Sequence, residues 1–385
     1  MSSPLRTVIL LAFKLGCIAF GGPAAHIAML RQEVVERRGW MEDQRFLDLL
    51  GITNLIPGPN STEMVMHIGQ ERGGWRGLVG AGIAFILPAV SITLVFAWLY
   101  GTYGTTTEGG WLLRGIKPVV LAVVLQAVWN LGRTAIKDVL LAVVGAAVFV
   151  LYLLGMNELV LLFGGAILAA VARWLANARS RPGSGTAHPG LAGILAAGST
   201  GLATVADPAV AYSGLRLFLT FLKIGGLLYG SGYVLVAFLR NDLVERLGWI
   251  TERQLLDAIA VGQFTPGPVF TTATFVGYLA GGFSGAILAT IAIFLPAFVF
   301  VAIVHPLLDR LTHLPWVRPI LDGINVAAIG LMAAVAVILS RDAIVDPLTG
   351  ILVVVALVLL VRFKVNSALL ILAGAAISVM LSFTG

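Results

Sequence analysis

Leu55–Glu63 reads LIPGPNSTE, and Phe264–Thr272 reads FTPGPVFTT. Both stretches lie among apolar segments, although proline and glycine interrupt helices. An interrupted helix leaves backbone N–H and C=O groups without intrahelical partners. Inside a bilayer such a break is tolerated only where it is buried in protein or lines a water-filled cavity. The repeated Pro-Gly-Pro therefore predicts two helix breaks that the rest of the chain must enclose.

The composition predicts an all-α polytopic membrane protein. Of the 385 residues, 58% are hydrophobic and 11% are charged, and the mean hydropathy is +0.96. An average soluble domain has about a quarter charged residues. Apolar runs of about 20 residues can cross a bilayer as helices, and they lack the alternation of barrel strands. We find no small-residue cleavage site after the first apolar segment, so we expect a retained helix.

The same composition excludes several classes of function. The net charge of +6 comes from arginines scattered over short loops, as orientation signals are, and does not indicate nucleic-acid binding. One cysteine, Cys17, excludes a disulfide framework and a cysteine metal cluster. The glycine clusters Gly73–Gly77 and Gly281–Gly285 lack a P-loop lysine. We find no nucleophile–histidine–carboxylate set, so we expect no cofactor, no metal and no enzymatic activity.

An internal repeat organises the chain. Without a gap, RQEVVERRGWMEDQRFLDLLGITNLIPGP (Arg31–Pro59) aligns with RNDLVERLGWITERQLLDAIAVGQFTPGP (Arg240–Pro268). Further matches are FKLGCIAFGGP (Phe13–Pro23) with LKIGGLLYGSG (Leu222–Gly232), GGWRG with GGFSG, and FILPA (Phe85–Ala89) with IFLPA (Ile293–Ala297). The expected domains are a first repeat at 1–176, a polar linker at 177–212 and a second repeat at 213–385.

Each half should contain about five crossing helices and one broken pair. We expect a first helix at Leu5–Met29, a polar amphipathic stretch at Arg31–Arg45, and short apolar pieces at Phe46–Ile56 and Asn60–Gln70. The pair is either a broken crossing helix or a re-entrant hairpin. The other predicted spans are Leu78–Tyr100, Lys117–Leu131, Val139–Leu154, Leu159–Leu175, Leu215–Leu239, Ala286–Val304, Ile320–Leu339, Ile344–Val361 and Ser367–Phe383. The short apolar run Leu191–Val205 stays unassigned.

Loop charges predict that the halves are inverted relative to each other. Arg72 and Arg76 follow the first broken pair, whereas Ala280–Gly285 carries no charge. One loop later the pattern is exchanged, since Gly101–Trp111 has no basic residue and the second half has Arg310 and Arg318. Basic loops prefer the cytoplasm. The exceptions, Arg240, Arg246 and Arg253, have acidic neighbours.

Inverted repeats with discontinuous helices are typical of secondary transporters, whose sites lie at the repeat interface. A helix start follows each Pro-Gly-Pro, and free N–H groups with a partial positive charge bind anions there. The predicted oxyanion-binding side chains are Asn60, Ser61, Thr62, Thr271 and Thr272. The alternative is that each motif (Pro57, Gly58, Pro59 and Pro266, Gly267, Pro268) is only a tight turn, with Asn60 as a helix cap.

The motifs also resemble a known family. FGGP (Phe20–Pro23), VVERRGW (Val34–Trp40), the Pro-Gly-Pro and the FxLP helix are similar to those of the chromate ion transporter family, in its two-domain form. The resemblance covers essentially the whole chain. It implies a bacterial or archaeal inner-membrane carrier that expels chromate, a sulfate-like oxyanion, and so confers chromate resistance. YGSG (Tyr229–Gly232) departs from FGGP, which puts equal roles for the two halves in doubt.

Other aligned polar residues are candidates for the same site. Lys14 and Lys223 are either anion ligands or residues that snorkel to the interface. Asn54 and Gln263 have amides that can donate to an anion. Glycines that permit close backbone approach, to the anion or to another helix, are Gly21, Gly22, Gly230 and Gly232.

Five further polar residues each have a structural interpretation. We expect His26 and His67 to be hydrogen-bonded polar groups without metal-ligand spacing. Asp48 and Asp257 align, and each is either a proton relay or the partner of an arginine in the VERxGW segment. Glu63, whose repeat partner is Thr272, is either part of a capping box with Asn60 or a coupling residue that takes up a proton when the anion binds.

The sequence leaves competing functions open. The leading interpretation is a secondary active oxyanion exporter, and the alternative is a carrier or channel for sulfate or another small anion. The expected partners are the oxyanion, the lipid bilayer, and a proton or counter-anion for coupling. A homodimer is compatible with the sequence, and nucleic acid is not an expected partner.

Overall fold

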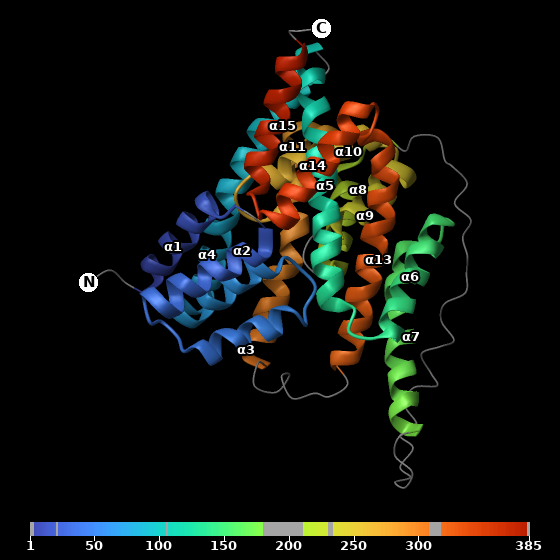
Figure 1. The fold of residues 1–385 in the computed structure, drawn as a ribbon. Coiled ribbons are helices and arrows are strands. Elements are labelled where there is room, and N and C mark those ends of the chain that lie inside the picture. Colours follow the sequence, from blue (N-terminus) through green and yellow to red (C-terminus); the bar gives the residue numbers. More distant parts are fainter. Residues whose placement is uncertain are drawn as a thin grey trace.

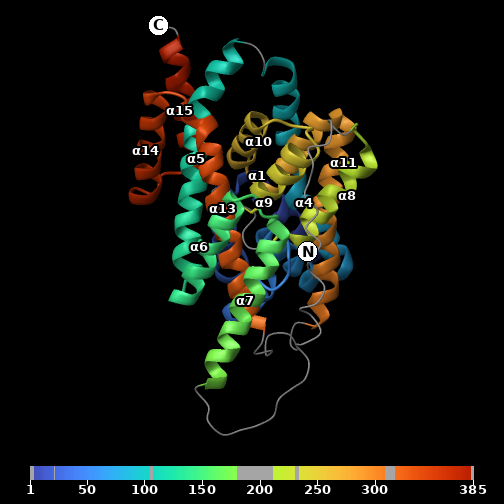
Figure 2. The ribbon, with the colours of Figure 1, turned by 90° about the vertical axis from the view of Figure 1, so that its right-hand side faces the viewer.

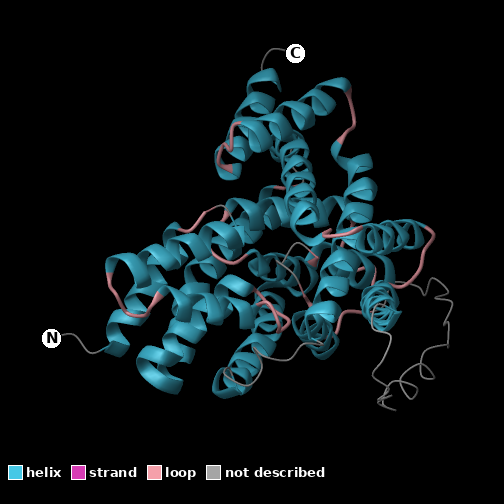
Figure 3. Ribbon diagram, turned by 60° about the horizontal axis from the view of Figure 1, so that its bottom comes forward, coloured by secondary structure: helices cyan, strands magenta, loops and turns pink. Residues whose placement is uncertain are grey.

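The computed structural model describes residues 4–20, 22–104, 107–179, 211–229, 234–307 and 317–382. Within these ranges the regular structure is helical and no strand occurs, as Figure 3 shows. The fold class expected from the composition is therefore confirmed. Most of the proposed linker, including Leu191–Val205, lies outside the described residues, although α7 continues into its first positions, to Arg179.

The first predicted helix of each half is interrupted. In place of one helix at Leu5–Met29, the structure has α1 (Pro4–Ile18) and α2 (Gly22–Arg31), followed by a π-helical turn η1 (Gln32–Arg37). The second half has α8 (Gly214–Leu227), α9 (Leu235–Leu239) and the π-helical turn η2 (Arg240–Arg246). Glycine weakens a helix, and Pro23 lacks an N–H but fits the first turn of a new one. The prediction of uninterrupted helices at Leu5–Met29 and Leu215–Leu239 was therefore wrong.

The broken pairs come next in each half. Helix α3 (Asp43–Thr53) precedes the first Pro-Gly-Pro, and α4 (Asn60–Tyr103) follows it. Helix α10 (Glu252–Phe264) precedes the second, which is followed by a 3₁₀ turn η3 (Val269–Thr271), by α11 (Thr272–Val304) and by a second 3₁₀ turn η4 (His305–Leu307). The two short pieces predicted from the sequence therefore correspond to α3 and to the start of α4, whereas the polar stretch Arg31–Arg45 is divided between η1 and the start of α3.

Both long helices, α4 and α11, turn back on themselves at a glycine with positive φ. Gly74 has φ 57° and Gly282 has φ 63°, within the aligned GGWRG and GGFSG clusters. A Cβ on Gly77 would collide with the carbonyl oxygen of Gly69, and one on Gly285 with that of Gly277. The two limbs on either side of each turn are thus in backbone contact, which only glycine permits at these positions.

The remaining helices form a bundle in which the halves interlock (Figures 1 and 2). It consists of α5 (Thr107–Ala135), α6 (Val139–Leu153), α7 (Glu158–Arg179), α13 (Val317–Ala343), α14 (Pro347–Arg362) and α15 (Ser367–Ser382). Helix α5 packs on α14 and α15 of the second half, whereas its repeat equivalent α13 packs on α6 and α7 of the first. Helices of each half therefore pack on helices of the other half, and neither half forms a separate domain.

Length and apolarity identify the candidate membrane spans. Among the described residues, four helical segments are long and apolar enough to cross a bilayer: Asn60–Tyr103, Arg114–Ala135, Val269–Leu307 and Ile320–Ala343. Val139–Leu153, Pro347–Arg362 and Ser367–Met380 are shorter apolar helices. The described part of the chain is that of a multi-pass membrane protein.

Close backbone contacts join the broken helices to these spans. Helix α1 packs along α4, α8 packs along α11, and α4 packs on α11. Gly16 of α1 lies against the carbonyl oxygen of Phe85, and Gly225 of α8 lies against that of Ile293. Phe85 and Ile293 begin the aligned FILPA and IFLPA motifs, so both halves use the same contact. This contact places the two helix breaks beside the two proline-containing helices.

Candidate functional site

The two Pro-Gly-Pro loops reach across to the opposite half. The Gly58 N–H donates to the Leu228 carbonyl oxygen over 2.7 Å, and the Gly267 N–H donates to the Ala19 carbonyl oxygen over 2.9 Å. Ala19 and Leu228 are equivalent positions at the ends of α1 and α8. Each loop therefore satisfies a carbonyl that the helix break of the other half leaves without an intrahelical partner.

Glycine is required in both loops by conformation and by space. Gly58 has φ 145° and Gly267 has φ 91°, a region that side-chain-bearing residues rarely adopt. A Cβ on Gly267 would lie 2.9 Å from Cβ of Ala89, and one on Gly58 would lie 3.4 Å from Cβ of Ala297. Ala89 and Ala297 end the aligned FILPA and IFLPA motifs. The two helix breaks, the two loops and the two proline-containing helices thus meet at the interface between the halves.

The start of α4 is built differently from the expected cap. Pro59 occupies the N-cap position without a side-chain cap, and Asn60 donates from Nδ2 to Asn54 Oδ1 over 2.6 Å. The assignment of Asn60 as the N-cap was therefore wrong. Because the Asn60 amide is held by Asn54, the structure brings together two residues that the sequence predicted for one site. The N–H groups of Thr62 and Glu63 donate to the Pro59 carbonyl oxygen, whereas those of Asn60 and Ser61 precede the first intrahelical hydrogen bond.

His26 connects this helix start to the break in α1. Its Nε2 lies 2.9 Å from the Ala19 carbonyl oxygen, and its Nδ1 lies 3.2 Å from Ser61 Oγ. A carbonyl oxygen only accepts, so Nε2 carries the proton and Nδ1 accepts from the Ser61 hydroxyl. The expectation that His26 is a hydrogen-bonded polar group is confirmed. The Ser61 hydroxyl is thereby oriented by a residue on the far side of the break.

Thr62 and Glu63 are fully buried and lack partners. Both are 0% exposed, and neither the Thr62 hydroxyl nor either Glu63 carboxyl oxygen has a hydrogen-bond partner among the described residues. The Glu63 carboxyl lies against Gly58, where an added Cβ would collide with it. The expected capping box does not form, because Glu63 does not reach the N–H groups of the helix start. A buried carboxyl without a partner is energetically costly when charged.

The helix start in the second half carries weaker donors. The Thr271 hydroxyl donates to the Pro268 carbonyl oxygen over 2.9 Å, and the Thr272 hydroxyl donates to that of Val269 over 2.8 Å. Gln263 is buried, and its Nε2 has no partner among the described residues. The two halves therefore offer unequal donor sets, with the unpaired hydroxyl on Thr62 and the unpaired amide on Gln263.

The two aligned lysines are paired with carboxylates. Lys14 Nζ lies 2.8 Å from Glu33 Oε1, and Lys223 forms the equivalent salt bridge with Asp242. Glu33 also pairs with Arg37 and Arg38. The hydrogen bond from Lys14 holds the pKa of the Glu33 carboxyl below its ordinary value. These pairs fasten each first helix to the VERxGW segment of its own half, a role that the sequence alignment did not reveal.

The other aligned residues are placed as follows. Gly22 begins α2, whereas Gly21, Gly230 and Gly232 lie outside the described residues. Asp257 contacts Tyr100 and Lys117, and Asp48 accepts from Gln44. The expected pairing of these aspartates with arginines of the VERxGW segment was therefore wrong. His67 Nδ1 lies 2.9 Å from His305 Nδ1, a contact between the halves that the sequence gave no reason to expect.

Comparison with known proteins identifies the family. The chromate transporter family matches residues 6–170 and again residues 215–379. The chain belongs to the chromate transporter family. It is a family of transporters, and the two matches coincide with the two halves that interlock in the structure. No solved structure matched the chain.

Relatives cover nearly the whole chain. A chromate transport protein of Cupriavidus metallidurans is 29% identical over 97% of this chain and 92% of its own length. One of Pseudomonas aeruginosa is 33% identical over 85% of this chain and 79% of its own. An uncharacterized transporter of Methanocaldococcus jannaschii is 26% identical over 87% and 85%. Membership in this family implies an oxyanion as the substrate.

Proposed function

We propose that the protein is a secondary active transporter that exports chromate, or a sulfate-like oxyanion, across the inner (plasma) membrane and thereby confers chromate resistance. The single observation that supports this most is the reciprocal bonding of Gly58 to Leu228 and of Gly267 to Ala19. It gathers four breaks in helical structure at one interface between the repeats, where secondary transporters hold their substrates. The names of the relatives supply the substrate class.

The anion binds, in this proposal, between the start of α4 and the start of α11. Free N–H groups and the positive helix ends favour a dianion there. Thr62 is the foremost side-chain donor because its buried hydroxyl has no partner among the described residues. The supporting residues are Asn54, Asn60, Ser61, Gln263, Thr271 and Thr272, with Gly21, Gly22 and Gly230 allowing close approach. Lys14 and Lys223 attract the anion electrostatically without contacting it, since each forms a salt bridge with a carboxylate.

Substitution of Thr62 tests this site. Loss of one hydrogen bond to a charged group costs about 1.5–3 kcal/mol, so Thr62→Val should raise the half-saturating chromate concentration roughly tenfold or more. Thr271→Val, whose hydroxyl already donates to Pro268, should have a smaller effect and serves as the matched control. The measurement is chromate uptake into proteoliposomes over a range of concentrations. Wild-type affinity in Thr62→Val, at equal incorporation, rejects the site.

The two halves are, in this proposal, inverted in the membrane. The exchange of basic loops supports the inversion, and so does the odd number of crossings expected per half. Arg76 and Ser284, which follow the turns at Gly74 and Gly282, should then face opposite sides. Single cysteines at these positions in a Cys17→Ser background should differ in labelling by an impermeant maleimide on intact cells. Labelling of both from the same side contradicts the inverted arrangement.

A further inference from the structure

A line of titratable side chains runs along one face of α4. Glu63, His67 and Glu71 are spaced four residues apart, so their side chains are neighbours on the helix surface. Glu63 and His67 are both 0% exposed, whereas Glu71 is exposed and its Oε1 lies 2.7 Å from Nε of Arg45 on α3. The line therefore leads from the proposed anion site to the surface of the protein.

His67, in the middle of this line, is joined to the other half. Its Nδ1 lies 2.9 Å from Nδ1 of His305, which begins η4 at the end of α11. Two ring nitrogens at this distance form a hydrogen bond only if one carries a proton and the other accepts it. The pair therefore holds one proton between the rings. On the other side of the His67 ring, Nε2 is buried without a partner among the described residues, as are both Glu63 carboxyl oxygens.

Charged groups act on both ends of the line. Arg45 acts electrostatically on both histidines, and Glu71 acts on His305. Because Arg45 and Glu71 form a salt bridge with each other, their charges largely cancel at this end. At the inner end, the Glu63 carboxyl acts on the Tyr229 hydroxyl of the second half. Ionisable groups inside a membrane span are costly, and they are typical of proton pathways.

The second half lacks such a line at the corresponding place. Counted from its Pro-Gly-Pro, the equivalent positions of α11 are Thr272, Val276 and Ala280, none of which titrates. Apolar packing is therefore enough to build this limb of the helix, as α11 shows. The titratable groups of α4 call for a different explanation, and they occur in the half that carries Glu63.

We propose that His67 and His305 form a proton relay between Glu63 and the surface. Before the step, Nδ1 of His67 and Nε2 of His305 carry the protons. A rotation of the Glu63 side chain, or one bridging water, joins its carboxyl to Nε2 of His67. This Nε2 then takes the Glu63 proton, Nδ1 of His67 passes its own to Nδ1 of His305, and Nε2 of His305 releases one to the surface. One proton enters and one leaves, so both rings stay neutral and Glu63 becomes a carboxylate. The reverse sequence protonates Glu63 again.

This inference rests on the proposed transport function, with Glu63 as the group that carries the proton. His67→Asn separates a relay from a structural contact, because the new amide can keep a hydrogen bond to His305 but cannot pass a proton. It should slow proton-driven net uptake of chromate by about tenfold or more, since a positioned proton-transfer group accelerates its step by about 10²–10⁴-fold. Exchange of bound for free chromate moves no net proton and should keep the wild-type rate. The final level of accumulation should also be unchanged, because a relay alters the rate and not the driving force.

Proteoliposomes with a pH-sensitive dye inside measure net uptake, and labelled chromate in the same vesicles measures exchange. Deuterated water should slow net uptake by His67→Asn further and leave its exchange unchanged. His305→Asn, at the accessible end of the relay, should give the same pattern, and it provides the test if His67→Asn does not fold.

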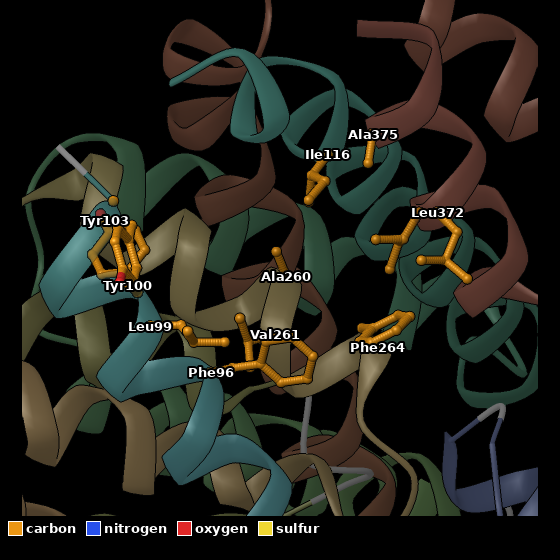
Figure 4. Close-up of a pocket in the computed structure, with 12 residues that line it drawn as sticks. Phe96, Leu99, Tyr100, Tyr103, Ile116, Ala260, Val261, Phe264, Leu372 and Ala375 are labelled. Atoms are coloured by element: carbon orange, nitrogen blue, oxygen red, sulfur yellow. The ribbon is translucent and has the colours of Figure 1, made fainter. Parts of the chain in front are cut away.

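Tyr100→Phe is the matched control. It removes a different hydrogen bond from α4 to the second half, since the Tyr100 hydroxyl donates to Asp257 over 2.8 Å. Tyr100 lies near the end of α4, where it lines an apolar cavity of about 450 Å³ between α4, α10 and α15 (Figure 4). This variant should leave the ratio of net uptake to exchange unchanged.

Two results overturn the relay. Equal slowing of net uptake and exchange in the histidine variants would show that His67 and His305 only hold the halves together. Wild-type net uptake in both variants would show that the proton takes another route. Exchange by the wild-type protein tests the transport function separately, so the relay can fail while that function stands.

Discussion

Glu63→Gln should abolish the accumulation of chromate against its gradient while leaving exchange of bound chromate for free chromate intact. The Glu63 carboxyl is fully buried against Gly58 and has no partner among the described residues. A charged carboxylate at this position would also repel a dianion bound at the adjacent helix start. Both groups fit the site together only if Glu63 carries a proton when the anion is bound. Uptake of the anion and of the proton are then coupled by electrostatic repulsion.

The expected effect is large because repulsion between charges in a low-dielectric site amounts to several kcal/mol. Glutamine has the shape of the protonated acid but cannot titrate, so the variant should bind the anion and lose the pH dependence of net transport. Proteoliposomes with an imposed proton gradient measure accumulation, and those without one measure exchange. Glu158→Gln is a matched control, since Glu158 is also a buried carboxyl but lies at the start of α7. Wild-type accumulation and pH profile in Glu63→Gln would falsify this coupling role.

Gly267→Ala should reduce transport to the background of empty liposomes. Its φ of 91° disfavours any residue with a Cβ by about 1–2 kcal/mol. The added methyl group would also lie 2.9 Å from Cβ of Ala89, and overpacking of this kind typically costs about 1–3 kcal/mol more. The substitution should break the hydrogen bond from the Gly267 N–H to the Ala19 carbonyl oxygen, which holds the loop against the opposite half.

Two further variants separate this loop from a general loss of stability. Gly155→Ala has a similar φ of 89° but open space around the new Cβ, so it should lower stability modestly and leave transport intact. Ala89→Gly removes the methyl group that the new side chain would meet, so combining it with Gly267→Ala should recover part of the transport. No recovery in the double variant, at normal expression, argues against the proposed contact.

Sequence reasoning predicted the repeat, the helical class and the existence of the two broken pairs, because each depends on local signals. Proline and glycine mark the breaks, and apolar runs mark the spans. The break inside the first helix was missed, although Gly21, Gly22 and Pro23 signalled it, because the apolar run continues on both sides. The sequence contains no local signal for the interlocking of the halves. It depends on the packing of α5 on α15 and of α13 on α7, and these helices lie far apart along the chain.

The partners of polar residues were the least predictable part. Lys14 and Lys223 were aligned with each other correctly, but nothing in the sequence indicates that each reaches a carboxylate 19 residues further along. His26 and Ser61 lie 35 residues apart and meet only because α2 folds back toward α4. The asymmetry between Asp48 and Asp257 is a property of the conformation, so an alignment of two similar segments cannot contain it.

Counterflow of labelled chromate in proteoliposomes tests most directly the claim that this protein is an oxyanion carrier with one shared site. Vesicles loaded with unlabelled chromate are diluted into medium with a trace of the labelled anion, without any ion gradient. The account predicts transient accumulation of label above equilibrium, and unlabelled sulfate inside the vesicles should support it as well, because the two dianions have the same shape and charge. Equilibration of label without overshoot would indicate a channel, and no uptake beyond that of empty vesicles would contradict transport of chromate altogether.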